Sequence, residues 1–130
     1  MRKVSNMETV SVENHFVAHH RDTGDTKHHP HKYVVELSGE YTVADVNTAE
    51  TLDDNLIVVL HDMNSADLNE LFEREARYSF RAPSLVNVAR YILWRIKDNL
   101  KVHPSMLNVT LTEIDEGNGN QRAVKMGVRM

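Results

Sequence analysis

The sequence predicts an α+β fold in which an antiparallel four-stranded sheet carries two helices on one face, in the order ββααββ. Two observations lead to this prediction. Towards both ends of the chain, apolar and polar residues alternate, which is typical of half-buried strands. In the middle, apolar residues recur at steps of three and four, which is typical of helices. The length of 130 residues corresponds to a single domain, residues 1–130.

The first two strands are expected to form an antiparallel pair. The first covers residues 8–20, and one of its faces carries Val10, Val12, Phe16, Ala18 and His20. A turn that contains Gly24 leads into a second strand over residues 29–38. His29 and His31 share a face with the apolar residues of this strand, so the pairing brings them close to His20.

The middle of the chain is expected to form a loop and two helices. Residues 39–55 are rich in Thr, Asp and Asn, which predicts a polar loop or an extension of the hairpin. The run LIVVL at 56–60 is β-like, and a helix is predicted to start near Asp62, because Asp can cap a helix. Pro83 suits the first position of the next helix, whose apolar stripe is Leu85, Val88, Ala89, Ile92, Ile96 and Leu100.

The last part of the chain predicts a second pair of strands. His103-Pro104 should end the preceding helix, since the residue before a proline disfavours helical backbone. Alternation over 107–114 predicts a strand whose inner face ends in Glu113, the GNGN at 117–120 predicts a turn, and 122–130 returns as the last strand.

Composition excludes several classes of protein. A net charge of −4 argues against broad attraction to nucleic acid or to an anionic membrane. The absence of cysteine excludes disulfides and thiolate chemistry and fits a reducing compartment. The N-terminus has no apolar core of the kind found in a signal peptide, and the longest aliphatic run is too short to span a bilayer. We therefore expect a cytoplasmic protein without nucleic-acid or membrane partners.

Histidine is the outlier, because six of the eight histidines lie between positions 15 and 31. Three of them, His20, His29 and His31, are predicted on core-facing strand positions. Glu113 occupies such a position as well, and a buried carboxylate needs a cation or hydrogen-bond donors. Three imidazoles on a rigid pair of strands suit zinc with an open fourth position, as in catalytic sites. The alternative is a polar end of the sheet in which the histidines are satisfied by hydrogen bonds alone.

Five segments carry a resemblance to a known family: FVAHHR, HPHKYVVEL, NLIVVLHDMN, APSLVNVARYILWRIK and VTLTEI. Over nearly its whole length the chain resembles the 6-pyruvoyl tetrahydropterin synthase and 6-carboxytetrahydropterin synthase family. The resemblance implies the tunnelling fold (T-fold), in which subunits join their sheets into a barrel, usually as a hexamer of two trimers. It also implies that His20, His29 and His31 bind zinc and that Glu113 anchors a pterin substrate through paired hydrogen bonds.

The resemblance implies a reaction in which zinc acidifies C–H bonds of dihydroneopterin triphosphate, a base moves protons and triphosphate leaves. The catalytic cysteine of the family corresponds to Asp25, and the Asp and His of its proton relay correspond to Asn64 and Ser65. The candidate bases are therefore Asp25, His61 and Asp62. Each also fits a structural role, in a turn for Asp25 and at a helix start for the other two.

The leading hypothesis is a zinc-dependent pterin lyase or synthase that acts on dihydroneopterin triphosphate or a related pterin. A catalytically degenerate homologue that binds a pterin or a purine-like ligand is the alternative, because the cysteine and the relay residues are all replaced. A cupin-like metal protein is disfavoured, since Glu36 lies on the opposite strand face from His29 and His31 and two long helices do not suit an all-β barrel. A histidine-rich metal buffer would leave Glu113 unexplained.

Overall fold

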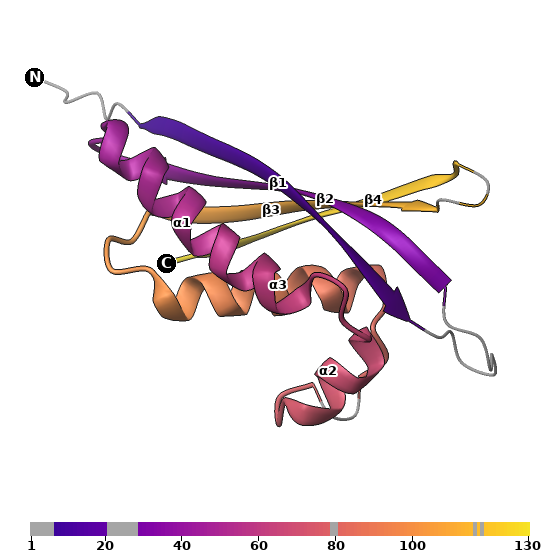
Figure 1. Cartoon of the computed structure of the whole chain (residues 1–130). Helices are drawn as coiled ribbons and strands as arrows, with labels where there is room; N and C mark the ends of the chain where they lie inside the picture. The colour runs from indigo at the N-terminus through magenta and orange to yellow at the C-terminus, as the bar shows by residue number, and fades with distance from the viewer. Residues whose placement is uncertain (1–6, 21–28, 79–80, 116, 118) are drawn as a thin grey trace, which may run out of the picture.

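The computed structural model describes residues 7–20, 29–78, 81–115, 117 and 119–130, and only the backbone of His29. The elements in chain order are β1 (Glu8–His20), β2 (His29–Tyr41), α1 (Val46–Met63), α2 (Leu68–Arg74), α3 (Leu85–Asn99), β3 (Met106–Asp115) and β4 (Gln121–Arg129). The strands form one antiparallel sheet in the order β1-β2-β3-β4. Both long helices, α1 and α3, cover the same face of this sheet (Figure 1). The predicted ββααββ order is confirmed, with the short α2 inserted between the two long helices.

The sheet has an apolar face because its strands alternate as the sequence predicts. In β3, Leu107, Val109 and Leu111 are fully buried, while the residues between them are only half-buried. Glu113 is the next residue in the same alternation and is buried too. The helix-facing side of the sheet therefore changes from apolar to polar towards one end, which is where the candidate site lies.

Two predictions for the middle of the chain were wrong, and both for the same reason. The hairpin extension ends at Tyr41, and residues 46–63 form α1 instead of a polar loop followed by a β-like run. A capping box begins the helix: the Asp45 carboxylate accepts a hydrogen bond from the Thr48 amide, and the Thr48 hydroxyl accepts one from the Asp45 amide. The polar residues belong to the exposed face of an amphipathic helix whose buried face is Leu52, Leu56, Val59, Leu60 and Met63. Tertiary packing outweighs the β-propensity of the aliphatic run.

The predicted start of a helix near Asp62 was also wrong, because α1 ends there, at Met63. The following helix, α2, begins at Leu68, and its N-cap is Asp67, whose carboxylate accepts hydrogen bonds from the amides of Asn69 and Glu70. Both segments contain residues that can cap a helix, and sequence alone did not show which of them does so.

The second long helix begins slightly later than predicted. Pro83 precedes α3 instead of occupying its first position, and Ser84 is the N-cap, with its hydroxyl accepting a hydrogen bond from the Asn87 amide. Among the described residues, no helix combines the length and the hydropathy needed to cross a membrane.

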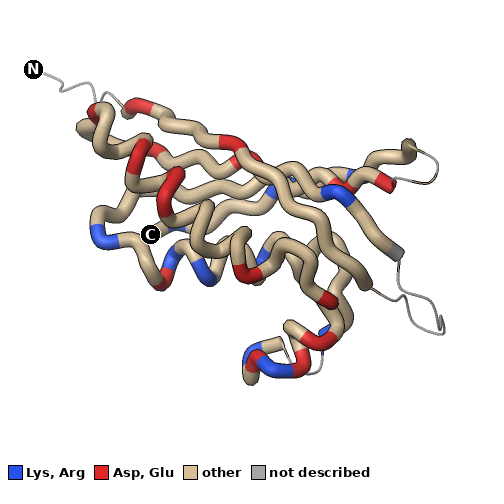
Figure 2. Tube along the Cα trace, viewed as in Figure 1, with Lys and Arg blue, Asp and Glu red and all other residues tan. Residues whose placement is uncertain are grey.

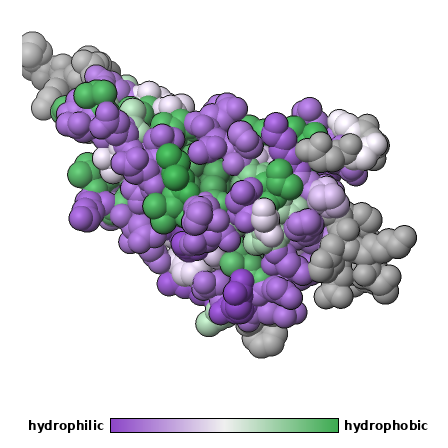
Figure 3. Space-filling model, in the orientation of Figure 1, coloured by the Kyte–Doolittle hydropathy of each residue, from purple (hydrophilic) through white to green (hydrophobic). Residues whose placement is uncertain are grey.

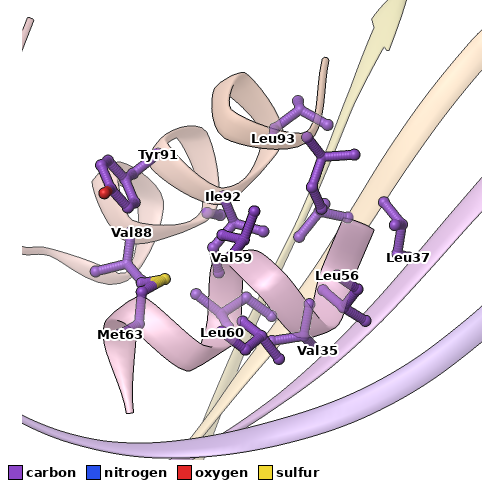
Figure 4. Packing of buried hydrophobic residues seen from close by; sticks show 14 of the residues in the cluster. Val35, Leu37, Leu56, Val59, Leu60, Met63, Val88, Tyr91, Ile92 and Leu93 are labelled. Carbon is purple, nitrogen blue, oxygen red and sulfur yellow. The ribbon is translucent and has the colours of Figure 1, made fainter. Parts of the chain in front are cut away.

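The core lies between the sheet and the two long helices. Figure 4 shows side chains of α1 and α3 meeting above β2, where Val35 and Leu37 point towards them. At the edge of the helix pair, the Arg95 guanidinium donates hydrogen bonds to Asp62 and to the Tyr91 hydroxyl, both at 2.8 Å. This packing holds the apolar face of the sheet, and hence the register of its strands, in place.

Neighbouring valines in α1 provide a test of its helical register. Val59 is 1% exposed and Val58 is 59% exposed. The face in Figure 3 shows hydrophobic surface in patches among hydrophilic side chains. We expect Val59→Ala to lower the free energy of unfolding by about 2 kcal/mol, because it removes buried methyl groups and leaves a cavity. Val58→Ala should change it by less than about 0.5 kcal/mol. Urea unfolding followed by circular dichroism measures both, and a larger loss in Val58→Ala would contradict the helix.

Candidate metal centre

Three polar side chains are buried at one end of the helix-facing side of the sheet. They are His20, the last residue of β1, His31 near the start of β2, and Glu113 near the end of β3, with 4%, 8% and 4% of their surfaces exposed. The register sets His31 opposite Ala18 and Glu113 opposite Tyr33. Side chains from three successive strands therefore gather in one place because all three strands keep the same inward alternation.

The three side chains are close enough to act together. The imidazole rings of His20 and His31 are stacked, with centroids 4.6 Å apart and an angle of 16° between their planes. His20 Nε2 lies 3.5 Å from Glu113 Oε2. One potential ligand atom from each residue falls within 4.8 Å of the other two. Among the residues that the structure describes, His20, His31 and Glu113 are therefore the candidate ligands for a metal ion.

The Glu113 carboxylate also accepts hydrogen bonds from a second residue of β2 and from β4. The Tyr33 hydroxyl on β2 donates a hydrogen bond to Oε2 at 3.0 Å, and Arg122 Nη2 on β4 donates one to Oε1 at 2.6 Å. Burial by itself raises the pKa of Glu113, but hydrogen bonds from His20, Arg122 and Tyr33, together with the positive charge of His31, lower it to about 2. The carboxylate is therefore ionised throughout the neutral range and available to bind a cation or donor groups.

The roles of Tyr33 and Arg122 were missed at the sequence level. Tyr33 lies two residues after His31 and so shares its strand face, and a buried tyrosine usually needs a partner for its hydroxyl, which is the signal that the sequence offers. Arg122 lies directly opposite Glu113 in the β3–β4 register. Its position depends on the length of the intervening turn, so composition alone did not reveal the pair.

The arrangement fits a metal ion. Tetrahedral ligands about 2.1 Å from zinc lie roughly 3.4 Å from one another. The ligand atoms of His20, His31 and Glu113 lie within 4.8 Å of one another, so the two stacked imidazoles have to turn and the atoms have to move closer to bind one ion. Two imidazole nitrogens and a carboxylate oxygen also suit zinc and similar divalent metals by their chemistry. The third predicted ligand, His29, is set opposite His20 by the strand register, and its side chain lies outside the described residues.

Two of the three candidate bases, His61 and Asp62, are not brought together with this group. His61 and Asp62 are exposed in the last turn of α1, and the Asp62 carboxylate is bound to Arg95. Neither is part of the group formed by the two histidines and Glu113. Asp25 lies outside the described residues.

The segment aligned with the family's relay lies against the edge of β1 instead. The side-chain oxygen of Asn64 accepts a hydrogen bond from the Val17 amide, and the Ser65 amide donates to the Val17 carbonyl. Ser65 has a φ of 64°, an uncommon left-handed conformation for a residue with a side chain. The His19 amide then donates to the Ala66 carbonyl at 2.9 Å. These contacts fix the end of β1 immediately before His20.

Two solved structures with the same architecture are 6-pyruvoyl tetrahydropterin synthases. The enzyme from Caenorhabditis elegans superposes with a TM-score of 0.64 at 14% identity, covering 96% of each chain. A catalytic-residue mutant of the Plasmodium vivax enzyme superposes with a TM-score of 0.70 at 12% identity, covering 96% of this chain and 99% of that one. The chain has the fold of a 6-pyruvoyl tetrahydropterin synthase. This confirms the tunnelling fold expected from the sequence. No protein-family model matches the chain, and no curated protein sequence gives a significant match.

The lowered pKa of Glu113 predicts a specific dependence of stability on pH in the metal-free protein. The folded state holds the pKa at about 2, below the ordinary value of 4.5, so its contribution is present above about pH 5 and is lost as the pH falls towards 2. The difference in free energy of unfolding between wild type and Glu113→Gln should therefore shrink over this range. Urea unfolding at several pH values, in the presence of a chelator, measures the difference.

A matched variant separates this effect from general acid unfolding. Glu50 is exposed on α1, and Glu50→Gln should differ from wild type by a nearly constant amount over the same pH range. If the gap for Glu113→Gln were equally constant, the carboxylate would not be held ionised by its neighbours.

Proposed function

We propose that the protein is a zinc-dependent pterin lyase or synthase that acts on dihydroneopterin triphosphate or a related pterin in the cytoplasm. The observation that carries the proposal is the buried group of two imidazoles and an ionised carboxylate. It lies at one end of a sheet whose fold is shared with the 6-pyruvoyl tetrahydropterin synthases.

Of the group described above, the two imidazoles of His20 and His31 would hold the metal together with His29, and the Glu113 carboxylate would be left to the substrate. His20 and His31 supply nitrogens from adjacent strands, and the register sets His29 opposite His20. A bound zinc ion would polarise oxygens of the pterin side chain and acidify the neighbouring C–H bonds. The two described imidazoles are buried and project from paired strands, so metal binding requires the rings to turn out of their stack while the backbone that carries them stays in place.

Glu113 would orient the pterin. Its two oxygens match the paired N–H donors of the guanidine-like edge of a pterin, and such paired bonds to a carboxylate are strong and directional. Arg122 now donates to one of these oxygens, but its side chain is 68% exposed and can move into solvent when a ligand arrives. Tyr33 is fully buried and would keep the other oxygen in position.

Asp25 is the proposed base. A glutamate is the catalytic residue substituted in the Plasmodium vivax enzyme, which shows that a carboxylate serves in the catalysis of that protein. Asp25 is the acidic residue that corresponds to the catalytic cysteine of the family. Asp25 would accept a proton from a carbon of the pterin side chain, and a base in such a role typically contributes about a hundredfold or more to the rate.

Assembly would complete the site. The sheet has two edge strands, β1 and β4. The outer backbone groups of β4 and of the part of β1 before Val17 can pair with further strands, whereas Val17 and His19 are already bonded to the segment that follows α1. We propose that copies of the chain join their sheets through these edges into a barrel, forming a hexamer of two trimers. His20 would then belong to one of the two strands that join neighbouring subunits.

Metal content tests the first part of the proposal. The purified protein should contain about one zinc ion per chain, and His31→Ala should lose it, because removal of one ligand sharply weakens binding. His15→Ala is the matched control, since His15 lies on the same strand as His20 but is exposed on the opposite face. Zinc retained in His31→Ala at the wild-type level would show that the metal, if bound, is held elsewhere.

Turnover separates an enzyme from a binding protein. The zinc-loaded protein should release triphosphate from dihydroneopterin triphosphate, and Asp25→Asn should slow this by about a hundredfold with pterin affinity unchanged. Glu113→Gln should instead weaken pterin binding by at least about tenfold while keeping the zinc. Tight binding without turnover in the wild type would support the catalytically degenerate homologue, which is favoured by the absence of His61 and Asp62 from the buried group.

A further inference from the structure

A cavity separate from the histidine group opens beside α3. It has a volume of about 510 Å³ and is lined by Arg77, Tyr78, Arg81, Arg90 and Trp94. Arg90 and Trp94 come from α3, and the other three lie in or after the turn that follows α2. Three of its five lining residues are therefore arginines, in a chain whose net charge is −4.

Two of these arginines are held by stacking on aromatic rings. The guanidinium carbon of Arg77 lies 4.5 Å from the centre of the Trp94 ring, and that of Arg81 lies 5.8 Å from the centre of the Tyr78 ring. The rings are fixed in turn, because Tyr78 packs against Trp94 with centroids 5.8 Å apart. Stacking restrains the plane of a guanidinium but leaves the N–H groups at its edge available for an anion.

The positive charge of the cavity is only weakly compensated. Arg77 forms an ion pair with Asp98 at 3.9 Å, and both side chains are more than half exposed. Within the described part of the chain, neither Arg81 nor Arg90 forms an ion pair with a carboxylate. Burial raises the pKa of Tyr78, and the charges of Arg81, Arg90 and Arg77 all oppose that rise, so the three guanidiniums act on one phenol.

The arginine cavity is distinguished by the placement of its three guanidiniums and not by the net charge of the surrounding region. Figure 2 shows basic and acidic segments interleaved around α2 and the turn beyond it. Three guanidiniums that surround one cavity repel each other, and an anion with several oxygens relieves that repulsion while accepting charge-assisted hydrogen bonds. Arginine is well suited to this role because its planar fork matches the oxygens of a phosphate group.

We propose that the cavity lined by Arg77, Tyr78, Arg81, Arg90 and Trp94 binds the phosphate groups of a small phosphorylated ligand. Its size and its three arginines suit a ligand with more than one phosphate. The site does not depend on the proposed pterin chemistry, since it shares no residue with the group at His20, His31 and Glu113.

The protein contains its own reporter for the test, because Trp94 is its single tryptophan. Titration with inorganic triphosphate should change the fluorescence of Trp94 in a saturable way, and potassium chloride at equal ionic strength should not. In Arg81→Gln/Arg90→Gln the affinity should fall by at least about tenfold for each arginine removed. Arg90→Gln alone should give a smaller loss, and it avoids disturbing the stacking on Tyr78.

The control is Arg74→Gln, which removes the same charge from an exposed arginine of α2 outside this cavity. Its affinity for triphosphate should stay within about twofold of wild type. If Arg74→Gln lost as much affinity for triphosphate as the cavity variants, binding would depend only on the overall charge and the proposal would be overturned. The absence of saturable binding would overturn it as well. Binding that disappears after metal chelation would place the triphosphate at the metal centre and overturn it too.

Discussion

The ionised carboxylate of Glu113, buried on the helix-facing side of the sheet, is the constraint on which the rest of the site depends. An isolated charge at such a position would be strongly unfavourable. Its partners His20, Tyr33 and Arg122 come from β1, β2 and β4, so the charge is compensated only when all four strands are in register. A shift of one residue in β3 would turn Glu113 to the opposite face. Fold and candidate site are therefore coupled through the same register.

The strands were predictable from the sequence because their signal is local. Alternation placed Phe16 and Ala18, and likewise Leu107 and Val109, on buried faces without knowledge of the partner strands. The start of α1 was not predictable in this way. The capping box at Asp45 looks like part of a polar loop until the helix is known, and the run at 56–60 favours a strand until its packing against α3 is known. Tertiary contacts made the choice in both places.

The candidate site was predictable to a similar extent. The inward positions of His20, His31 and Glu113 follow from alternation, and the structure brings the three together. The hydrogen bond from Arg122 depends on how β4 pairs with β3 after the turn. That His61 and Asp62 lie outside the group depends on where α1 ends. The arginine cavity combines a turn with α3 and left no periodic trace in the sequence. Features that follow from the alternation within one strand can therefore be predicted from the sequence, whereas features that combine residues of several elements cannot.

The crystal structure of the zinc-loaded protein, with the metal located by anomalous scattering, would test the central claim most directly. The account predicts a zinc ion about 2.0–2.3 Å from ring nitrogens of both His20 and His31, with the imidazoles turned out of their stacked arrangement. The contradicting result is a zinc ion bound only at other residues. In that case the rings of His20 and His31 would keep their 4.6 Å stack, and Glu113 would keep its contacts with Tyr33 and Arg122.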